Sequence, residues 1–464
     1  MANEFVARKG IIAQANSTIT GSLTTTCDSV INNLTVGKGA GNITTNTAIG
    51  SGSLKVNSTG FKNTAIGHSA LSANTSGYSN TAIGYKALTA NTTNPSYALT
   101  GTKNTAVGTH ALKSNTFGYF NTAVGYDALC SNVGQADSSY GQNNTAVGMY
   151  SLRSNTNGYG NTAVGRNSLL CNTTSAGNTA VGMSTLTLNT TGRSNTAVGY
   201  NASANNTTGE YNIAVGRNAL LSNTIGSRNT AIGNFALQNN THCYNTAVGY
   251  HASVYNTTGT RNTSLGYKAL AFNVTGSNNV ALGHNAGRYI ANGSTTLTAA
   301  SSSIFIGQNA KASGSGQTNQ IVIGAGTTGL GSNTTVIGNT NTTTTYIYGN
   351  TTISGSVNIT PSSSFQYQQN LAASSTATIA TIPTGSYRSS FFDYLAVNNG
   401  TGSRAGTVFT VWSGSSVEYV ETATSDIGIT SALTLSASLN SGNIILQSVS
   451  TLGTWSVKTL ARLL

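Results

Sequence analysis

The sequence predicts an all-β protein in which a solenoid of roughly 17-residue coils precedes a C-terminal β-sandwich. A short motif recurs through residues 41–340, and residues 362–464 contain short segments of alternating polarity. Only 6% of the 464 residues are charged, against about a quarter in ordinary soluble domains. With 54 glycines and 3 prolines, the composition excludes both a helical protein and collagen.

The recurring motif is Asn-Thr-Ala-Val/Ile-Gly, and 11 of the 16 intervals between its closing glycines are 17 residues long. Two of the longer intervals predict loop insertions at 92–102 and 135–142. The strong copies close at Gly50, Gly67, Gly84, Gly108, Gly125, Gly148, Gly165, Gly182, Gly199, Gly216, Gly233, Gly249, Gly266 and Gly283, and weaker ones at Gly307, Gly324 and Gly338.

Each position of the unit has an expected structural role. Ala123 and Val124 alternate in a short strand and must point to opposite faces. The first Asn of each copy is expected to stack into side-chain amide ladders, and the closing Gly to adopt a positive φ. The following Ala-Leu pair predicts a second strand, and the Asn-Thr-Thr-Gly segment at 189–192 a turn. We expect the motif Thr to face inward.

The predicted interior of one coil is thin, because it holds one Val or Ile, one Leu and small Ala side chains. Such a column buries little apolar area by itself. The Ala at a fixed position suggests a second close-packed face, satisfied by lateral association of identical chains. The sequence therefore predicts a homo-oligomer.

Residues 195–202, which begin Asn-Thr-Ala-Val-Gly-Tyr, resemble the Ser-Val-Ala-Ile-Gly repeat of trimeric autotransporter adhesin heads. The 17-residue style also resembles repeats in tail fibres of phages and other large DNA viruses. This resemblance covers roughly residues 37–338 and implies a homotrimer of left-handed parallel β-rolls. The N-terminus lacks a signal peptide, and the end Ala-Arg-Leu-Leu lacks an autotransporter anchor, which favours the viral fibre.

The chain divides by composition into four expected segments. Residues 1–40 are expected to cap or attach the shaft, 41–340 to form it, 341–361 to form a β neck, and 362–464 to form the sandwich. Candidate strands of the sandwich are Thr376–Ile382, Tyr387–Val397, Thr407–Trp412, Val417–Thr422, Ala432–Leu439, Asn443–Val449 and Thr454–Leu460. Its resemblance to terminal domains of viral fibres implies a trimer cap or a receptor binder.

Two groups of residues are candidates for host recognition. In the C-terminal domain these are Tyr394, Trp412, Tyr419, Asn398, Asn399 and Thr401. Along the shaft, the residue after the closing Gly is repeatedly aromatic, and equivalent positions of a solenoid share one edge. This stripe contains Tyr85, Tyr126, Tyr200, Tyr250 and Tyr267. It either binds glycans or only covers a corner of the coil.

Catalytic and cofactor sites are not expected. A polysaccharide-cleaving site needs a carboxylate pair, and Asp127, Asp137 and Glu210 are the only acids between 46 and 340. The five histidines and four cysteines are dispersed, so neither a metal site nor a disulfide framework is predicted. The net charge of +12 is spread singly, which disfavours nucleic-acid binding, and no apolar run suits membrane insertion.

The sequence as a whole favours a virion structural fibre, carried as an external appendage and extracellular on release. Its expected partners are two further copies, a host surface glycan or receptor, and a baseplate, tail or capsid protein of the virion. Three alternatives remain: a bacterial surface adhesin, an ice-binding solenoid, and a polysaccharide depolymerase. An ice-binding surface requires a flat exposed Thr array, which inward-facing Thr residues do not supply.

Overall fold

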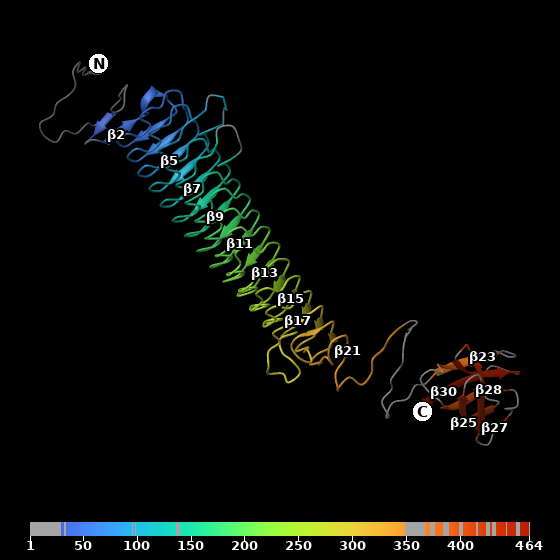
Figure 1. The fold of residues 1–464 in the computed structure, drawn as a ribbon. Coiled ribbons are helices and arrows are strands. Elements are labelled where there is room, and N and C mark those ends of the chain that lie inside the picture. The colour runs from blue at the N-terminus through green and yellow to red at the C-terminus, as the bar shows by residue number, and fades with distance from the viewer. Residues whose placement is uncertain are drawn as a thin grey trace, which may run out of the picture. The chain divides into compact units, whose positions relative to one another are not determined.

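The computed structural model describes residues 29–31, 34–94, 96–97, 99–135, 140–348, 367–371, 376–383, 389–398, 402–413, 416–423, 427–428, 433–441, 443–451 and 455–463. The chain divides into two compact units, Met1–Thr345 and Tyr346–Leu464 (Figure 1). Within the described residues, all regular structure is β apart from one short 3₁₀ turn, η1 (Ala40–Asn42). Among them there is no helix with the length and apolarity needed to cross a bilayer.

The first unit is the predicted solenoid, which we call the shaft. Each coil contributes one three-residue strand to a continuous parallel sheet (Figure 1). These strands are β3 (Thr47–Ile49), β4 (Thr64–Ile66), β5 (Thr81–Ile83), β6 (Thr105–Val107), β7 (Thr122–Val124), β8 (Thr145–Val147), β9 (Thr162–Val164), β10 (Thr179–Val181), β11 (Thr196–Val198), β12 (Ile213–Val215), β13 (Thr230–Ile232), β14 (Thr246–Val248), β15 (Thr263–Leu265), β16 (Val280–Leu282), β18 (Ile304–Ile306), β20 (Ile321–Ile323) and β21 (Thr335–Ile337).

The register of this sheet places identical motif positions directly above one another. Between β10 and β11, for example, Thr179 pairs with Thr196 and Val181 with Val198. At the N-terminal end, β1 (Ser29–Ile31) and β2 (Leu34–Gly37) form an antiparallel pair, and β2 continues antiparallel onto β3. This hairpin covers the open edge that a parallel solenoid would otherwise expose. A small second sheet pairs β17 (Ala300–Ser301) with β19 (Gln317–Thr318).

The directions in which the strand side chains point correct two expectations, that the motif Thr faces inward and that the Val or Ile fills the interior. In β10 the central Ala180 is fully buried, whereas Val181 is 36% exposed and Thr179 is half-buried. The motif Thr and the Val or Ile therefore both point outward, and Ala points inward. Because a strand alternates, the side chain that fits the interior decides the facing of all three. The coil is narrow, and Leu186 from its opposite wall already fills it, so a small side chain fits at Ala180.

The Ala-Leu segment is not the second strand that the sequence suggested. Ser184 and Leu186 adopt left-handed φ angles of 57° and 48°. The backbone of this wall still bonds between coils, because Leu186 N–H donates to the Ala202 carbonyl at 3.1 Å. Ser184 N–H donates in the opposite direction, to the Arg166 carbonyl at 2.9 Å. The alternating conformation thus directs hydrogen bonds to both neighbouring coils without forming a strand.

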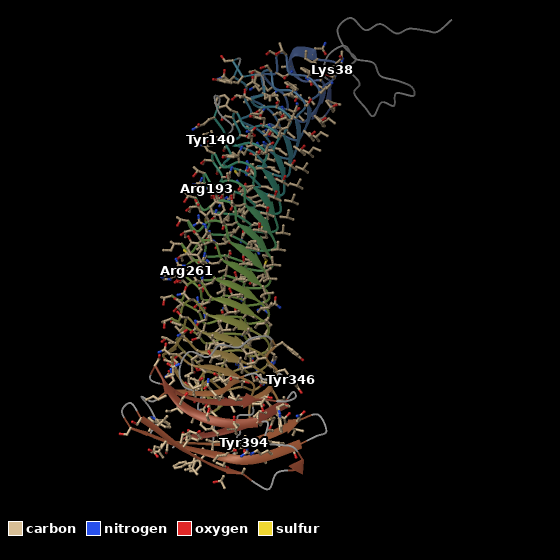
Figure 2. All side chains as sticks on the ribbon, turned by 90° about the vertical axis from the view of Figure 1, so that its right-hand side faces the viewer. Lys38, Tyr140, Arg193, Arg261, Tyr346 and Tyr394 are labelled. Atoms are coloured by element: carbon tan, nitrogen blue, oxygen red, sulfur yellow. The ribbon has the colours of Figure 1, made fainter. Side chains whose placement is uncertain are left out.

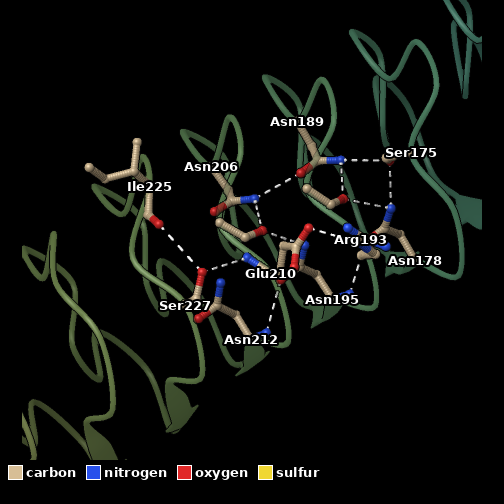
Figure 3. Close-up of polar contacts among 12 residues, drawn as sticks. Ser175, Asn178, Asn189, Arg193, Asn195, Asn206, Glu210, Asn212, Ile225 and Ser227 are labelled. Atoms are coloured by element: carbon tan, nitrogen blue, oxygen red, sulfur yellow. Dashed lines mark hydrogen bonds and ion pairs between the residues drawn. The ribbon is translucent and has the colours of Figure 1, made fainter.

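Buried asparagines hold successive coils together, as the first motif position predicted. Asn195 N–H donates to Asn178 Oδ1 at 2.9 Å, and Asn195 Nδ2 donates to the Gly209 carbonyl at 2.8 Å (Figure 3). A second column, at the Asn that opens the turn, forms the more regular amide-to-amide ladder. There Asn206 Nδ2 donates to Asn189 Oδ1 at 2.8 Å. The ladder joins Asn57, Asn74, Asn91, Asn115, Asn132, Asn155, Asn172, Asn189, Asn206 and Asn223.

The second unit is a β-sandwich, as predicted. One sheet has the order β22-β30-β24-β25-β26 with β27 on β25, and the other the order β23-β29-β28. Fully buried Phe392 and Trp455 from the first sheet pack in one core with Ile444 and Leu446 from the second. The strands are β22 (Tyr367–Leu371), β23 (Thr376–Pro383), β24 (Ser389–Asn398), β25 (Gly402–Ser413), β26 (Ser416–Ala423), β27 (Ile427–Gly428), β28 (Leu433–Asn440), β29 (Asn443–Ser450) and β30 (Trp455–Leu463).

All seven candidate strands of this domain match observed strands, and among the described residues the sequence did not predict the short strands β22 and β27. Of the expected β neck, the described part 341–348 contains no strand, and Tyr346 and Tyr348 there are 76% and 91% exposed. Residues 349–361 lie outside the described residues, as do 1–28 of the expected capping segment.

Removing one asparagine of the ladder should destabilise the shaft. Asn189→Ala removes the acceptor of one Asn206 amide hydrogen and one of the two donors to the Gly192 carbonyl, which keeps its bond from Asn178. At about 1–3 kcal/mol for an unpaired buried group, we expect a loss of about 1–3 kcal/mol. Guanidinium unfolding followed by circular dichroism measures it. The exposed turn residue Thr208 is the control, since Thr208→Ala should change stability by less than about 0.5 kcal/mol.

The closing glycines should be intolerant of any side chain. Gly182 has a φ of 130°, and a Cβ there would lie 2.6 Å from the Gly199 carbonyl oxygen of the next coil. We expect Gly182→Ala to cost at least about 3 kcal/mol, from backbone strain and separation of the coils. Gly160 has a φ of 62° and open space around its Cβ position, so Gly160→Ala should cost only about 1–2 kcal/mol. Equal costs would contradict this account.

Candidate binding surface along the shaft

The outward side of the parallel sheet forms a continuous uncharged surface, which we call the strand face. It consists of the first and third residues of β3 to β16, β18, β20 and β21, which are Thr, Val, Ile or Leu throughout. Nine consecutive coils, from Thr47 to Thr196, present Thr in the first column. In the second column, Val198, Ile232 and Leu265 are 36%, 40% and 45% exposed. An uncharged, half-exposed sheet of this length is suited to a partner surface.

The five tyrosines of the predicted stripe are exposed and border the strand face on the side where each strand ends. We call Tyr85, Tyr126, Tyr200, Tyr250 and Tyr267, which are 40–45% exposed, the tyrosine ladder. Neighbouring rings stack along the shaft: Tyr250 and Tyr267 have centroids 5.5 Å apart, and Tyr267 and His284 5.0 Å apart. Met149, Arg166 and Met183 occupy the equivalent position in other coils and interrupt the row.

Cations lie against these rings rather than in a separate patch. Lys86 Nζ is 5.1 Å from the centroid of Tyr85, and Lys268 Nζ is 5.0 Å from that of Tyr267. The guanidinium of Arg217 lies between Tyr200 and Phe235, at 6.0 and 5.6 Å. Such cation–π contacts are each worth about 0.5–1 kcal/mol at exposed sites and hold both side chains along the edge.

A second aromatic and cationic row, which the sequence analysis did not identify, borders the strand face on the side where each strand begins. We call Tyr211, Arg228, Tyr244 and Arg261 the arginine–tyrosine ladder, because they occupy one position in four consecutive coils. That position directly precedes the motif Asn. Aligning the repeats by this residue, rather than by the residue after the Gly, would have disclosed the alternation.

The few acids of the shaft are engaged by nearby bases. Asp127 Oδ1 is 3.2 Å from His110 Nδ1, and its Oδ2 is 3.5 Å from Arg153 Nε. Glu210 Oε1 accepts from Arg193 Nε at 2.8 Å, which raises the pKa of the Arg193 guanidinium (Figure 3). Asp137 lies outside the described residues. Among the described residues, no group of three His, Cys, Asp or Glu side chains is placed to hold a metal ion.

In the C-terminal domain the structure separates the candidate recognition residues. Tyr394 and Trp412 are only 4% and 5% exposed and belong to the sandwich core, so their rings offer no surface to a receptor. They alternate inward with Phe392 along their strands, and the Tyr394 hydroxyl donates to Glu421. Tyr419 is 42% exposed and Asn398 is half-buried. Asn399 and Thr401 lie outside the described residues.

An open apolar groove of about 310 Å³ lies on the shaft wall next to the turns. Tyr255 and Phe272 stack in it with centroids 5.0 Å apart. Asn239, Thr257, Val274 and Thr298 complete its lining. Its lining contains no charged residue, and no titratable group other than the Tyr255 hydroxyl.

Comparison with known proteins identifies no family for this chain. No protein-family model and no curated protein matches it. Among solved structures, the tailspike protein of Acinetobacter phage vB_ApiP_P1 aligns with 86% of this chain and 80% of its own, at 12% identity and a TM-score of 0.22. A TM-score this low supports no inference about fold or function.

One histidine beside the tyrosine ladder, His251, stacks on Tyr250 and should titrate at a pH that depends on a neighbouring cation. Burial lowers the pKa of His251, and the positive charges of Lys268 and Arg288 lower it further. Folding therefore favours the neutral ring. Its contribution to stability is complete above the ordinary His pKa of about 6.5 and declines as the pH falls through that value toward the lower folded pKa.

We expect Lys268→Gln to raise the pKa of His251 toward its ordinary value, because one positive charge is removed. Histidine-selective ¹³C NMR titration measures this shift, with His251→Asn assigning the resonance. Asn suits the left-handed φ of 56° at this position. A His251 resonance that titrates at the same pH in both proteins would contradict the electrostatic cause.

Proposed function

We propose that this chain is the subunit of a homotrimeric fibre that attaches a virion to a host surface and has no enzymatic activity. The observation that carries the proposal is the strand face, an uncharged strip along the whole shaft. The interrupted tyrosine ladder borders it on one side, and over four coils the arginine–tyrosine ladder borders it on the other. This composition is that of an interface core with a polar rim. The number of copies rests on the resemblance of the repeat to trimeric adhesin heads and viral fibres.

The area of the strand face is large enough for a stable interface. At ~4.8 Å per coil and ~3.3 Å per strand residue, seventeen three-residue strands cover a strip of roughly 80 by 10 Å. This is about the 800 Å² per partner that specific protein complexes bury. We therefore propose that further copies of this chain cover the strand face. A baseplate, tail or capsid protein would hold the fibre on the virion.

With the strand face covered, the two ladders remain as the accessible edges of the shaft. Aromatic and cationic side chains recur from coil to coil along these edges, so weak contacts to a repetitive surface polymer accumulate. This supports a host glycan as the ligand class. Tyr419 and Asn398 of the C-terminal domain remain proposed contacts to a receptor.

The arrangement of acids supports an adhesive rather than a hydrolytic fibre. A glycosidase places two carboxyl groups about 5–10 Å apart across its substrate. In the described residues Asp127 contacts His110 and Arg153, and Glu210 pairs with Arg193. In the sandwich Glu421 pairs with Arg404 at 3.1 Å, and Thr407 donates to Asp393 at 2.6 Å. The carboxylates of Asp127, Glu210, Glu421 and Asp393 are thus each bound to a base or a hydroxyl group.

One observation favours a second candidate, an ice-binding solenoid. The Thr column faces outward, contrary to our expectation, and forms a regular in-register array beside the Val and Ile column. Oligomerisation through the strand face would hide this array from ice. A monomer with thermal hysteresis in a freezing-point assay would support ice binding, whereas an oligomer without hysteresis supports the fibre.

The oligomer is tested by mass measurement in solution. Light scattering should give three times the chain mass of 47.2 kDa. Val181→Arg/Val198→Arg places two charges in the strand face and should yield monomers, because buried unpaired charges are strongly unfavourable. Thr191→Arg/Thr208→Arg adds the same charges on exposed turns of the same two coils and should leave the mass unchanged. A wild-type monomer would refute the proposed assembly.

Attachment is tested on an array of surface polysaccharides. The intact oligomer should be retained by at least one polymer, with retention lost on dilution of the immobilised ligand because binding is multivalent. It should release no new reducing ends from that polymer. Cleavage would establish a depolymerase instead, and absence of retention on every polymer would contradict glycan-mediated attachment.

A further inference from the structure

The arginine–tyrosine ladder is a continuous series of contacts between coils. The Arg228 guanidinium carbon lies 5.6 Å from the ring centroids of both Tyr211 and Tyr244, so the cation is held between two rings. Arg261 continues the series at 5.6 Å from Tyr244. Arg228 Nη1 also donates to the Tyr244 hydroxyl at 3.1 Å. The side chains therefore form one preorganised row along the edge of the shaft.

The fold keeps this row exposed and evenly spaced. All four residues have left-handed φ angles of 55–64°, which places them on a sharp turn just before the buried motif Asn. Tyr211 and Tyr244 are 48% and 47% exposed. Arg193, one residue earlier in its coil, lies on the same edge as Arg261 (Figure 2). With ~4.8 Å between coils, Arg228 and Arg261 are about 10 Å apart, with Tyr244 in the coil between them.

The charge of the ladder is not balanced by acids. Glu210 is the one acid on this edge in the described part of the shaft, and Arg193 already binds it at 2.8 Å. No acidic partner of Arg228 or Arg261 is present among the described residues. A guanidinium has five N–H donors in a planar fork that fits carboxylate and sulfate oxygens. Arg228 uses one of them on Tyr244.

We propose that the arginine–tyrosine ladder binds an anionic polysaccharide, with acidic groups on Arg228 and Arg261 and sugar hydroxyls against the exposed edges and hydroxyl groups of Tyr211 and Tyr244. This rests on the proposed attachment function and specifies its ligand class. Extended sugar chains carry rings at a spacing comparable to that of the coils, so a linear polymer follows the edge. Arg228 and Arg261 are two coils apart, so a polymer with an acidic group on at least every second sugar can reach both of them.

A nucleic acid fits these observations less well. Its affinity comes from many phosphate contacts, which require a dense stripe of bases. This ladder offers two unpaired arginines over four coils. Single-stranded DNA is therefore the probe that separates electrostatic attraction to any polyanion from recognition of sugars.

The test measures binding of the intact chain to polygalacturonate, with its neutral methyl ester as the matched polymer without charge. Wild-type protein should bind the acid and not the ester. Arg228→Gln/Arg261→Gln should weaken binding by at least about tenfold, since the charge-assisted hydrogen bonds of two guanidinium groups to the polymer are lost. Lys55→Gln/Lys113→Gln removes the same charge at two residues outside both ladders and should change binding less than about threefold.

Two further variants examine the ring and the guanidinium geometry. Tyr244→Asn retains a residue that tolerates the φ of 64° and should weaken binding to polygalacturonate. Arg228→Lys keeps the charge but loses the planar fork, and should bind more weakly than wild type. Unfolding temperatures of all variants should stay near that of wild type, because the ladder is on the surface.

Equal losses in the ladder and control variants would overturn the inference, because net charge alone would then explain binding. Binding to single-stranded DNA as tight as to polygalacturonate would do so as well. These results leave the fibre proposal intact if the protein is oligomeric and retained on another polysaccharide. An intact ladder on a monomer that binds polygalacturonate would instead refute the fibre and keep this site.

Discussion

The stacking of coils through buried amides is the interaction on which the rest of the shaft depends. A coil this narrow brings backbone carbonyls and N–H groups into an interior without water, where each must find a partner. Asn195 and Asn206 meet that need, because one amide both donates within its coil and accepts from the next. The asparagines therefore replace much of the apolar core that a larger domain would use. The scarcity of charge follows, since most positions of a coil serve stacking, turns or close packing.

The same constraint determines what the outside of the shaft looks like. Because Gly182 and its equivalents let coils approach with no side chain between them, every coil has the same height and the same register. A residue type placed at one outward position then becomes a row. Rows of Thr and Val make the strand face, and rows of Tyr, Arg, Lys and His make its two borders. Each surface of the shaft is thus formed by residues at the same position of successive coils rather than by residues consecutive in the sequence.

The sequence predicted the elements of the fold that depend on periodicity, and it did not predict those that depend on closure of the coil. The Asn and Gly positions, the strand at each motif and the seven long strands of the sandwich follow from repeat spacing and alternation. Alternation also required Ala180 and Val181 to face opposite ways, but not which one faces inward. That choice is made by Leu186 on the opposite wall. Likewise the sequence suggested that Tyr394 and Trp412 are exposed, whereas in the structure the packing of the two sheets encloses both side chains.

The sequence revealed the tyrosine ladder but not the arginine–tyrosine ladder, and the reason is physical. The tyrosine ladder repeats one residue type, so it is evident from a single column of the repeat. The arginine–tyrosine ladder alternates two types, and its meaning lies in the contact between coils: Arg228 is enclosed by rings that precede and follow it by about 17 residues. Alternation keeps like charges two coils apart, which limits their repulsion while leaving each guanidinium open to a ligand. An edge built this way attracts acidic polymers without the charge density that would make it bind every polyanion.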